Sequence, residues 1–165
     1  MSHSFTFSGK NNLTDSELSK NHFQNSNFTL QCWIQTTTVG EILSKQTNET
    51  SFALRVNSKG HIVFTVTNNE NTRTITATNV SVLDNEWYHI TAVKTTTFLY
   101  LYINDLKLII ENSEESVSSN SQLDIFSVGG NVIPNFFHGI ISQVAIWNKA
   151  LLENEVALIR EQEDI

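Results

Sequence analysis

The sequence has very little of several residue types that usually signal a function. Its 165 residues include one proline and one cysteine, Cys32, and only 16% of them are charged. A single cysteine excludes an internal disulfide and a zinc site built from several thiolates. Seventeen acidic residues outnumber ten basic ones, so the chain lacks the positive field that attracts phosphate backbones or anionic lipids. We therefore expect neither nucleic acid binding nor membrane insertion.

Long apolar runs are also missing. No stretch approaches the roughly 18 apolar residues that cross a bilayer. The start, MSHSFTFSGKNN, lacks the cationic and apolar blocks of a secretory signal. As written, the chain is expected to be cytoplasmic, or extracellular if it is released unconventionally or excised from a larger secreted protein. Its length fits one buried core, and we expect a single domain over residues 1–165.

Apolar residues spaced by two are abundant. In NFTLQCWIQT, alternate residues from Phe28 to Ile34 share one face, as a half-buried strand requires. Cys32 is then a core side chain. The segments 51–57 and 61–67 repeat the pattern, and the SKG between them predicts a hairpin.

The same spacing predicts strands in six further segments, 72–78, 87–94, 97–104, 106–111, 123–130 and 138–148. Only ALLENEVALIREQ carries helical spacing, with its apolar residues grouped toward one side: Leu151, Leu152, Val156, Leu158 and Ile159. Short strands, frequent turns and one core predict an all-β fold. We expect a two-sheet antiparallel β-sandwich or jelly roll with one short C-terminal helix.

The segment DNEWYHITAV crowds acidic, aromatic and histidine residues together, as an active site does. Strand alternation argues against chemistry there. Asp84 and Asn85 fit a turn. Trp87 then points into the core and His89 shares its face, so that Glu86 and His89 diverge. We interpret His89 as a hydrogen-bonded structural residue.

A family resemblance follows from longer segments. DNEWYHITAVKTTTFLYLYINDLKL resembles the pattern of laminin G-like and pentraxin-like domains, in which an Asp-x-x-Trp-His-like start opens a strand and an Asp-Gly-type turn closes the next hairpin. FSVGGN and FFHGIISQVAIWNKALLENEVALI are similar to that family's Ile-Gly-Gly element, its Phe-x-Gly-x-Ile-Asp-Glu-Val strand and its ending. FTFSGKNN and NFTLQCWIQT are similar to its first strand and its Phe-Thr-x-Glu-x-Trp strand. The resemblance implies a concanavalin A-like sandwich.

The chain departs from that pattern at acidic positions. Ser142 and Gln143 stand where Asp and Glu are common, and Gln31 stands where a Glu is common. Glycoside hydrolysis needs two carboxyls facing one bond. The sandwich hydrolases that the chain resembles carry a Glu-x-Asp-x-x-Glu run on one strand, which is missing here. Asp84 and Glu86 precede their strand, and we expect no catalysis.

Calcium binding is what the resemblance to pentraxin-like members implies. The positions aligned with their calcium ligands are Asn48, Glu49 and Asn131. Calcium prefers six to eight hard oxygens, usually with several carboxylates among them. One carboxylate and two amides make a poor cage, so we expect that no cofactor is required.

The strand TFLYLYIN presents a stripe of aromatic rings. Phe98, Tyr100 and Tyr102 point one way, and the alternating leucines and isoleucine point the other. If the leucines pack inward, the rings offer flat apolar surface suited to sugar rings or to a protein interface. A covering loop or a neighbouring subunit is an equally good explanation of the stripe.

Amide-rich loops are a second candidate binding surface. If they gather at one rim, they bring Phe136 together with Asn48, Glu49, Asn68, Asn69, Asn131 and Asn135. An amide both donates and accepts hydrogen bonds, as a sugar hydroxyl does. Asparagine is equally a common turn residue, which is the alternative explanation.

We therefore predict a non-enzymatic, lectin-like module for a glycan or glycoconjugate, with six ligand-binding residues: Asn48, Glu49, Asn131, Asn135, Phe136 and Tyr100. The competing hypothesis is a protein–protein interaction or oligomerisation module. In that case the aromatic face is the interface, homo-oligomers form, and the amides only make turns.

Overall fold

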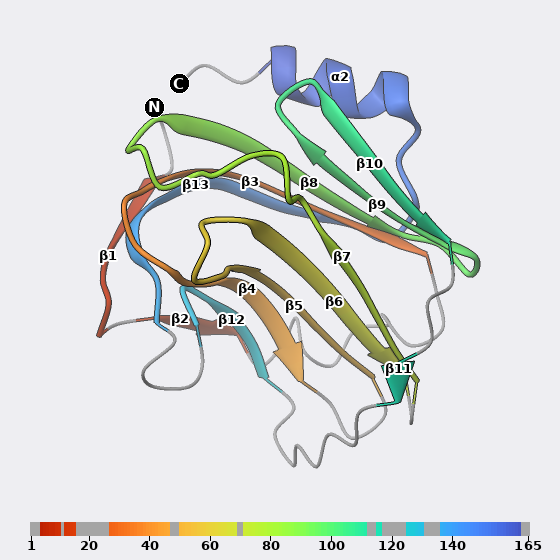
Figure 1. The fold of residues 1–165 in the computed structure, drawn as a ribbon, viewed down its shortest axis with the longest axis horizontal. Coiled ribbons are helices and arrows are strands. Elements are labelled where there is room, and N and C mark those ends of the chain that lie inside the picture. The colour runs from red at the N-terminus through yellow and green to blue at the C-terminus, as the bar shows by residue number, and fades with distance from the viewer. Residues whose placement is uncertain are drawn as a thin grey trace.

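Two antiparallel sheets lie face to face in the computed structural model (Figure 1). The structure describes residues 4–10, 12–15, 27–46, 50–68, 71–111, 115–116, 125–130 and 136–162. Within them, one sheet has six strands, in the spatial order β1 (Ser4–Ser8), β13 (His138–Trp147), β3 (Phe28–Thr36), β8 (Trp87–Lys94), β9 (Phe98–Ile103) and β10 (Leu106–Glu111). The other has seven, in the order β11 (Glu115–Ser116), β7 (Asn71–Thr76), β6 (Ile62–Asn68), β5 (Thr50–Val56), β4 (Gly40–Gln46), β12 (Ile125–Val128) and β2 (Leu13–Asp15). The predicted sandwich is confirmed.

Alternating side chains of the two sheets build the core. Phe28, Cys32 and Ile34 of β3 are fully buried between the sheets, as their spacing predicts. The segments 51–57 and 61–67 form the hairpin of β5 and β6. In its turn, Asn57 Oδ1 accepts hydrogen bonds from the backbone N–H groups of Lys59 and His61.

One central strand is missed by the alternation. β4 carries a register shift between Glu41 and Leu43 against β5. Ile42 and Leu43 are consecutive in the sequence and both fully buried in the core. A bulge of this kind breaks the period of two, so the pattern does not predict β4.

Trp87 lies on the outer face of the six-stranded sheet, so the prediction that it points into the core is wrong. Tyr88 and Ile90 pack toward the core, so alternation sends Trp87 and His89 to the opposite, outer face. Trp87 is half-buried there. The two residues do share a face, but it is not the face inside the sandwich.

Helix α2 (Glu153–Glu161) lies over this outer face (Figure 1). Val156 of the helix and Leu151 before it pack with Val93 and Tyr102 of the sheet. Tyr102 is only 6% exposed as a result. Its match to a tyrosine of the family pattern predicts a structural role for Tyr102, which this burial agrees with. The C-terminal segment covers it, rather than a loop or a second subunit.

The polar and apolar faces of α2 differ from the predicted grouping. Leu152 and Leu158 are 64% and 52% exposed, whereas Val156 is buried and Ile159 is partly buried. The apolar stripe that meets the sheet is thus narrower than the sequence indicates. Among the described residues, no helix is long and apolar enough to span a membrane.

Gly129 provides a test of the packing between the sheets. Its φ is +84°, and a Cβ added there would lie 2.5 Å from ring atoms of the buried Phe7. Gly129→Ala should lose about 1–2 kcal/mol to left-handed strain and about 1–3 kcal/mol more to overpacking. Gly9→Ala is the matched control, because Gly9 has a φ of +79° and its added Cβ meets His138 at an ordinary 3.5 Å. Equal losses of unfolding free energy in denaturant titrations would contradict the packing described.

Candidate functional site

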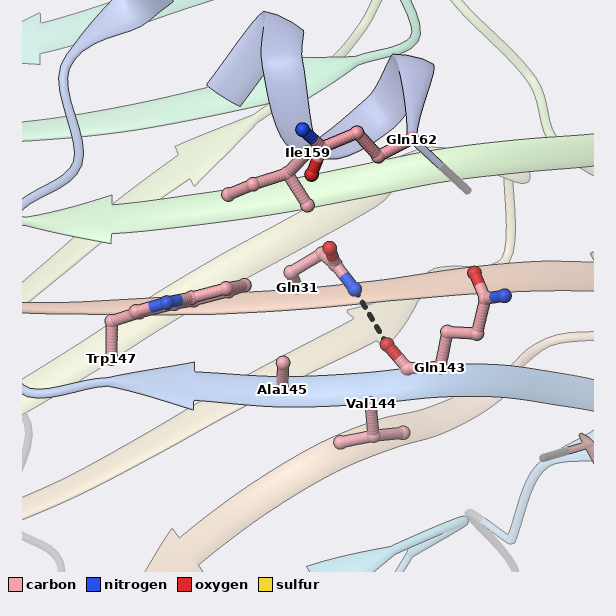
Figure 2. A pocket seen from close by; sticks show the side chains of 7 residues that line it. All are labelled: Gln31, Gln143, Val144, Ala145, Trp147, Ile159 and Gln162. Atoms are coloured by element: carbon pink, nitrogen blue, oxygen red, sulfur yellow. Dashed lines mark hydrogen bonds between the residues drawn. The ribbon is translucent and has the colours of Figure 1, made fainter. Parts of the chain in front are cut away.

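A pocket of about 450 Å³ opens beside α2 on the outer face of the six-stranded sheet (Figure 2). β3 and β13 form its floor, and the last turns of the helix form one wall. The residues that line it are Gln31, Gln143, Val144, Ala145, Trp147, Ile159 and Gln162.

A β-bulge in β13 positions the amides of the pocket. The register of β13 against β3 shifts between Ser142 and Ala145, and Gln143 within the shift has a φ of +54°. That left-handed conformation is uncommon for a residue other than glycine. The backbone carbonyl of Gln143 accepts a hydrogen bond of 2.5 Å from Nε2 of Gln31. The bulge therefore brings Gln31 and Gln143 together on the floor of the pocket.

Both glutamines keep an unused acceptor. Gln31 is 1% exposed, and its Oε1 has no hydrogen-bond partner among the described residues. The same holds for Oε1 of Gln143. Trp147, which is half-buried on the same floor, adds the flat apolar surface of an indole. The pocket thus combines amide groups with an aromatic ring and aliphatic walls.

Buried polar side chains continue from the pocket along β3 and β8. In the register of these strands, Gln31 lies opposite Thr91 and Trp33 lies opposite His89. We call these four residues the polar strip. Gln31 Oε1, Trp33 Nε1, Thr91 Oγ1 and both ring nitrogens of His89 are buried without a hydrogen-bond partner in the described part of the chain. The strip is costly for stability, because a buried polar atom without a partner loses its bonds to water.

His89 is more isolated than its sequence context predicts. Its side chain is 0% exposed, and its ring centroid lies 4.9 Å from that of Trp33. Only the backbone N–H of His89 is bonded to a side chain, to Oδ1 of Asn104 at 2.9 Å. The predicted hydrogen-bonded imidazole is therefore wrong within the described residues. Burial, with a smaller effect of the positive charge of Arg160, lowers the pKa of His89 to about 4, so the ring is neutral at pH 7.

Few polar contacts hold α2 against the sheet. Near its end, Arg160 donates to the carbonyl of Asn104 at 2.7 Å and pairs with Asp105 at 2.7 Å. Near its start, Lys107 pairs with Glu153 at 2.6 Å. Before the helix, Thr29 Oγ1 donates to the carbonyl of Lys149 and accepts from the N–H of Leu151. The entry to the helix is thus anchored inside the protein, whereas its ion pairs to the sheet are largely at the surface.

Tyr100 lies beside the other end of the helix. A second pocket, of about 320 Å³, is lined by Tyr100, Tyr102 and Lys107 together with residues 150–153. The Lys107 ammonium is 5.4 Å from the centroid of the Tyr100 ring. Tyr100 and Phe98 are both half-buried, so these two rings are the partly accessible remainder of the predicted aromatic stripe.

Asp84 is held in a structural turn. Its carboxylate accepts hydrogen bonds from the Tyr88 hydroxyl at 2.7 Å and from the N–H of Glu86 at 3.1 Å. The hydrogen bond from Tyr88 lowers the pKa of Asp84. Burial, and then the bond to Asp84, raises the pKa of Tyr88 to about 12. Asn85 follows with a φ of +65°, which confirms the predicted turn.

The structure describes two of the loop candidates, Asn68, which is the last residue of β6, and Phe136. Phe136 forms an isolated bridge with Glu41, near the first residue of β4. The opposite end of β4 is Gln46, which pairs with Ser51 of β5. At about 3.3 Å per strand residue, Gln46 lies roughly 16 Å from Glu41. The other candidates, Asn48, Glu49, Asn69, Asn131 and Asn135, fall outside the described residues, so their part in binding stays a prediction.

The sequence contained a signal for Gln31 and Gln143 that pattern reasoning did not use. Both stand where acidic residues are common in the family pattern, and 112 positions separate them. Treating them as a pair would have suggested a shared site. Trp147 and Ile159 carried no such signal, because they read as ordinary strand and helix core residues.

The donor set of the pocket does not fit a metal ion. Its oxygen donors come from neutral amides and backbone carbonyls, and none of the seven lining residues has a carboxylate. Within the described residues, no group of three or more His, Cys, Asp or Glu side chains is placed to hold a metal. Calcium needs more and harder oxygen ligands than these amides offer.

Comparison with known proteins identifies the fold. A laminin G-type family model, described as the concanavalin A-like lectin/glucanases superfamily, matches residues 8–157. No curated protein sequence matches closely enough to count as a relative.

Three solved structures are similar over most of the chain. Domains LG4-5 of the mouse laminin alpha1 chain give a TM-score of 0.68 at 13% identity, over 93% of this chain and 44% of that one. A heptameric SAP-like pentraxin from Limulus polyphemus gives 0.65 at 16%, over 94% and 80%. The binding domain of botulinum neurotoxin DC, in complex with rat synaptotagmin II, gives 0.60 at 17%, over 83% and 36%. The chain thus spans less than half of the laminin fragment, and identities this low show a common fold.

The buried imidazole predicts a pH dependence of stability. In the unfolded chain His89 takes up a proton near its ordinary pKa of 6.5, whereas in the fold it does so only near 4. Because the unfolded state binds the proton first, the free energy of unfolding should fall as the pH drops from about 6.5 to 4, by up to about 3 kcal/mol. Denaturant titrations across this range should show the slope reduced in His89→Gln and retained in His61→Gln. An unchanged slope in His89→Gln would contradict the buried, neutral ring.

Proposed function

Because the chain belongs to the concanavalin A-like lectin/glucanases superfamily, we propose that it is a non-enzymatic module that binds carbohydrate in the pocket beside α2. The observation that carries this proposal is the convergence of Gln31 and Gln143 on one floor with the indole of Trp147. Sugar hydroxyls both donate and accept hydrogen bonds, which side-chain amides match in both roles. The apolar face of a sugar ring stacks on an aromatic ring, and Trp147 supplies one.

Binding without turnover agrees with the lining of the pocket. Glycoside hydrolysis requires an acid and a second carboxylate on either side of the bond. The seven lining residues offer two amides on the floor, a third from Gln162, and otherwise apolar groups. These groups hold and orient a hydroxylated ligand, but they do not transfer protons to a leaving group near neutral pH.

A protein partner is the alternative function. Leu152, just before α2, and Leu158, within it, are both exposed, and exposed leucines make apolar contacts available to a partner. The similar botulinum neurotoxin domain was solved with rat synaptotagmin II, and the similar pentraxin is heptameric. The carbohydrate proposal is preferred because the amides and the indole line one pocket, whereas Leu152 and Leu158 line no common pocket among those described.

Gln143→Gly tests the carbohydrate site without damaging the fold. Glycine accepts the φ of +54° more readily than glutamine does, so stability should stay within about 1 kcal/mol of the unaltered chain while the amide is lost. We expect saturable binding on a glycan array to fall at least tenfold. Asn85→Gly is the matched control, because it changes another positive φ, of +65°, in a turn outside the pocket. Equal glycan binding in all three proteins would refute the proposed site.

Calcium removal separates a binding site made of amides from one that needs calcium. With amides as the oxygen donors, glycan binding should be unchanged by a chelator such as EDTA. A calcium-dependent signal would instead implicate Asn48, Glu49 and Asn131.

The mass in solution tests the protein-interaction function. If no glycan binds, and light scattering finds an oligomer that the double variant Leu152→Ser/Leu158→Ser dissociates, the protein-interaction function replaces the carbohydrate function.

A further inference from the structure

The polar strip and the pocket are parts of one surface. Gln31 belongs to both, since it lines the pocket and lies opposite Thr91 in the register of β3 and β8. Next along the same strands lie Trp33 and His89, also opposite each other. All four side chains share the outer face, because the residues between them point into the core. A ligand that extends from the pocket along this face would meet Thr91, and then His89 and Trp33.

The C-terminal helix region closes this path. Tyr102, directly opposite Thr91 on β9, is packed under Leu151 and Val156. Arg160, near the end of α2, acts electrostatically on His89. Ile159 and Gln162 border the pocket beside Gln31. Thr91 and His89, on the face that this region covers, are both 0% exposed.

The chemistry of the covered surface is wrong for permanent burial. The strip presents five buried polar atoms without a partner among the described residues, two of them on His89. Docking of α2 gains the apolar contacts of Val156 and Leu151, but it removes water from these atoms. A helix of nine residues is marginal without its tertiary contacts, and surface ion pairs such as Arg160 with Asp105 add little.

We infer that the polar strip is the inner part of a carbohydrate-binding groove, and that α2 is a movable cover over it. The inference rests on the proposed function and extends it to a ligand class, neutral oligosaccharides longer than the pocket holds. The first sugar lies on the floor of the pocket that β3 and β13 form, beside Trp147, and this floor stays in place when α2 moves. The following sugars lie along Thr91 and His89 once α2 swings away about its entry, which stays anchored by the two hydrogen bonds to Thr29. The donors Trp33 Nε1 and Thr91 Oγ1 and the acceptor Gln31 Oε1 then bond to sugar hydroxyls.

Thr91→Val tests the strip with a side chain of the same shape. The substitution removes the unpaired hydroxyl, so the closed protein should melt at an equal or higher temperature and exchange its α2 amide hydrogens more slowly. The probes are neutral oligosaccharides of glucose, galactose, mannose and N-acetylglucosamine with one to six residues. Affinity for chains of three or more residues should fall about tenfold, while affinity for single sugars stays the same. A lower melting temperature with unchanged affinities would overturn the inference.

Arg160→Ala tests the cover. Loss of the contacts to Asn104 and Asp105 should speed amide exchange in α2 and raise the affinity for the longer sugars about threefold, because less of the binding energy is spent on opening. Lys149→Ala is the matched control, since it removes an ion pair to Glu155 within the C-terminal segment and leaves the sheet contacts intact. Faster exchange without any change in affinity would overturn the movable cover.

The two proposals fail in different ways. If single sugars bind and lose their affinity in Gln143→Gly, but chain length and Thr91→Val have no effect, the pocket is a carbohydrate site and the inference about the strip is wrong. If none of the sugars binds the unaltered chain, the proposed function is wrong, and the groove that rests on it is wrong as well.

Discussion

The central strands of the six-stranded sheet are buried on both faces, and the rest of the structure depends on this constraint. Residues of β3 and β8 point alternately into the apolar core and toward α2, and nearly all of them are shielded from water. The inner face carries the aliphatic and aromatic side chains that a buried core requires. The outer face holds a mixture: Val93 and Tyr102 meet the helix region as apolar surface, whereas Gln31, Thr91 and His89 beside them are polar. The sheet therefore has one face that stabilises the fold and one face whose chemistry conflicts with its burial.

Much of the fold could be predicted from the sequence because a strand's period of two is local. The spacing from Phe28 to Ile34, or along the hairpin of β5 and β6, needs no knowledge of distant residues. Two kinds of information are not local. A bulge changes the parity of the pattern, as at Ile42 and Leu43 of β4. Burial on the outer face depends on a helix some 50 residues further along the chain, so the cover over Tyr102 could not be read from its own strand.

The candidate site was harder to predict, because its parts meet only through the register. Gln31 and Gln143 are joined by a hydrogen bond across 112 positions of the sequence, and the bulge that allows it leaves no glycine as a marker. Sequence reasoning favoured asparagine-rich loops and aromatic rings, since these residue types suit sugars wherever they occur. Of those candidates, Tyr100 lies beside α2 in a separate pocket, and Phe136 lies at the first residues of β4 in the other sheet. Residue type indicated the ligand class, while the bulge and the helix determined the place.

Two pairs of threonines in the seven-stranded sheet show how this chain can satisfy hydroxyls across neighbouring strands. Thr67 and Thr72 face each other across β6 and β7 with their hydroxyl oxygens 3.1 Å apart, and Thr65 and Thr74 repeat the arrangement at 3.2 Å. Thr91, equally buried, lies between Gln31 and Tyr102 and bonds to neither in the described structure. A strand pair of threonines, or a valine, would remove that cost without changing the fold. The seven-stranded sheet also buries the hydroxyls of Ser44 and Ser127 without a partner among the described residues. The polar strip differs in gathering five such atoms on neighbouring positions of two strands, next to the pocket. A cluster of this kind beside a pocket is what a binding surface produces when its partners come from outside the chain.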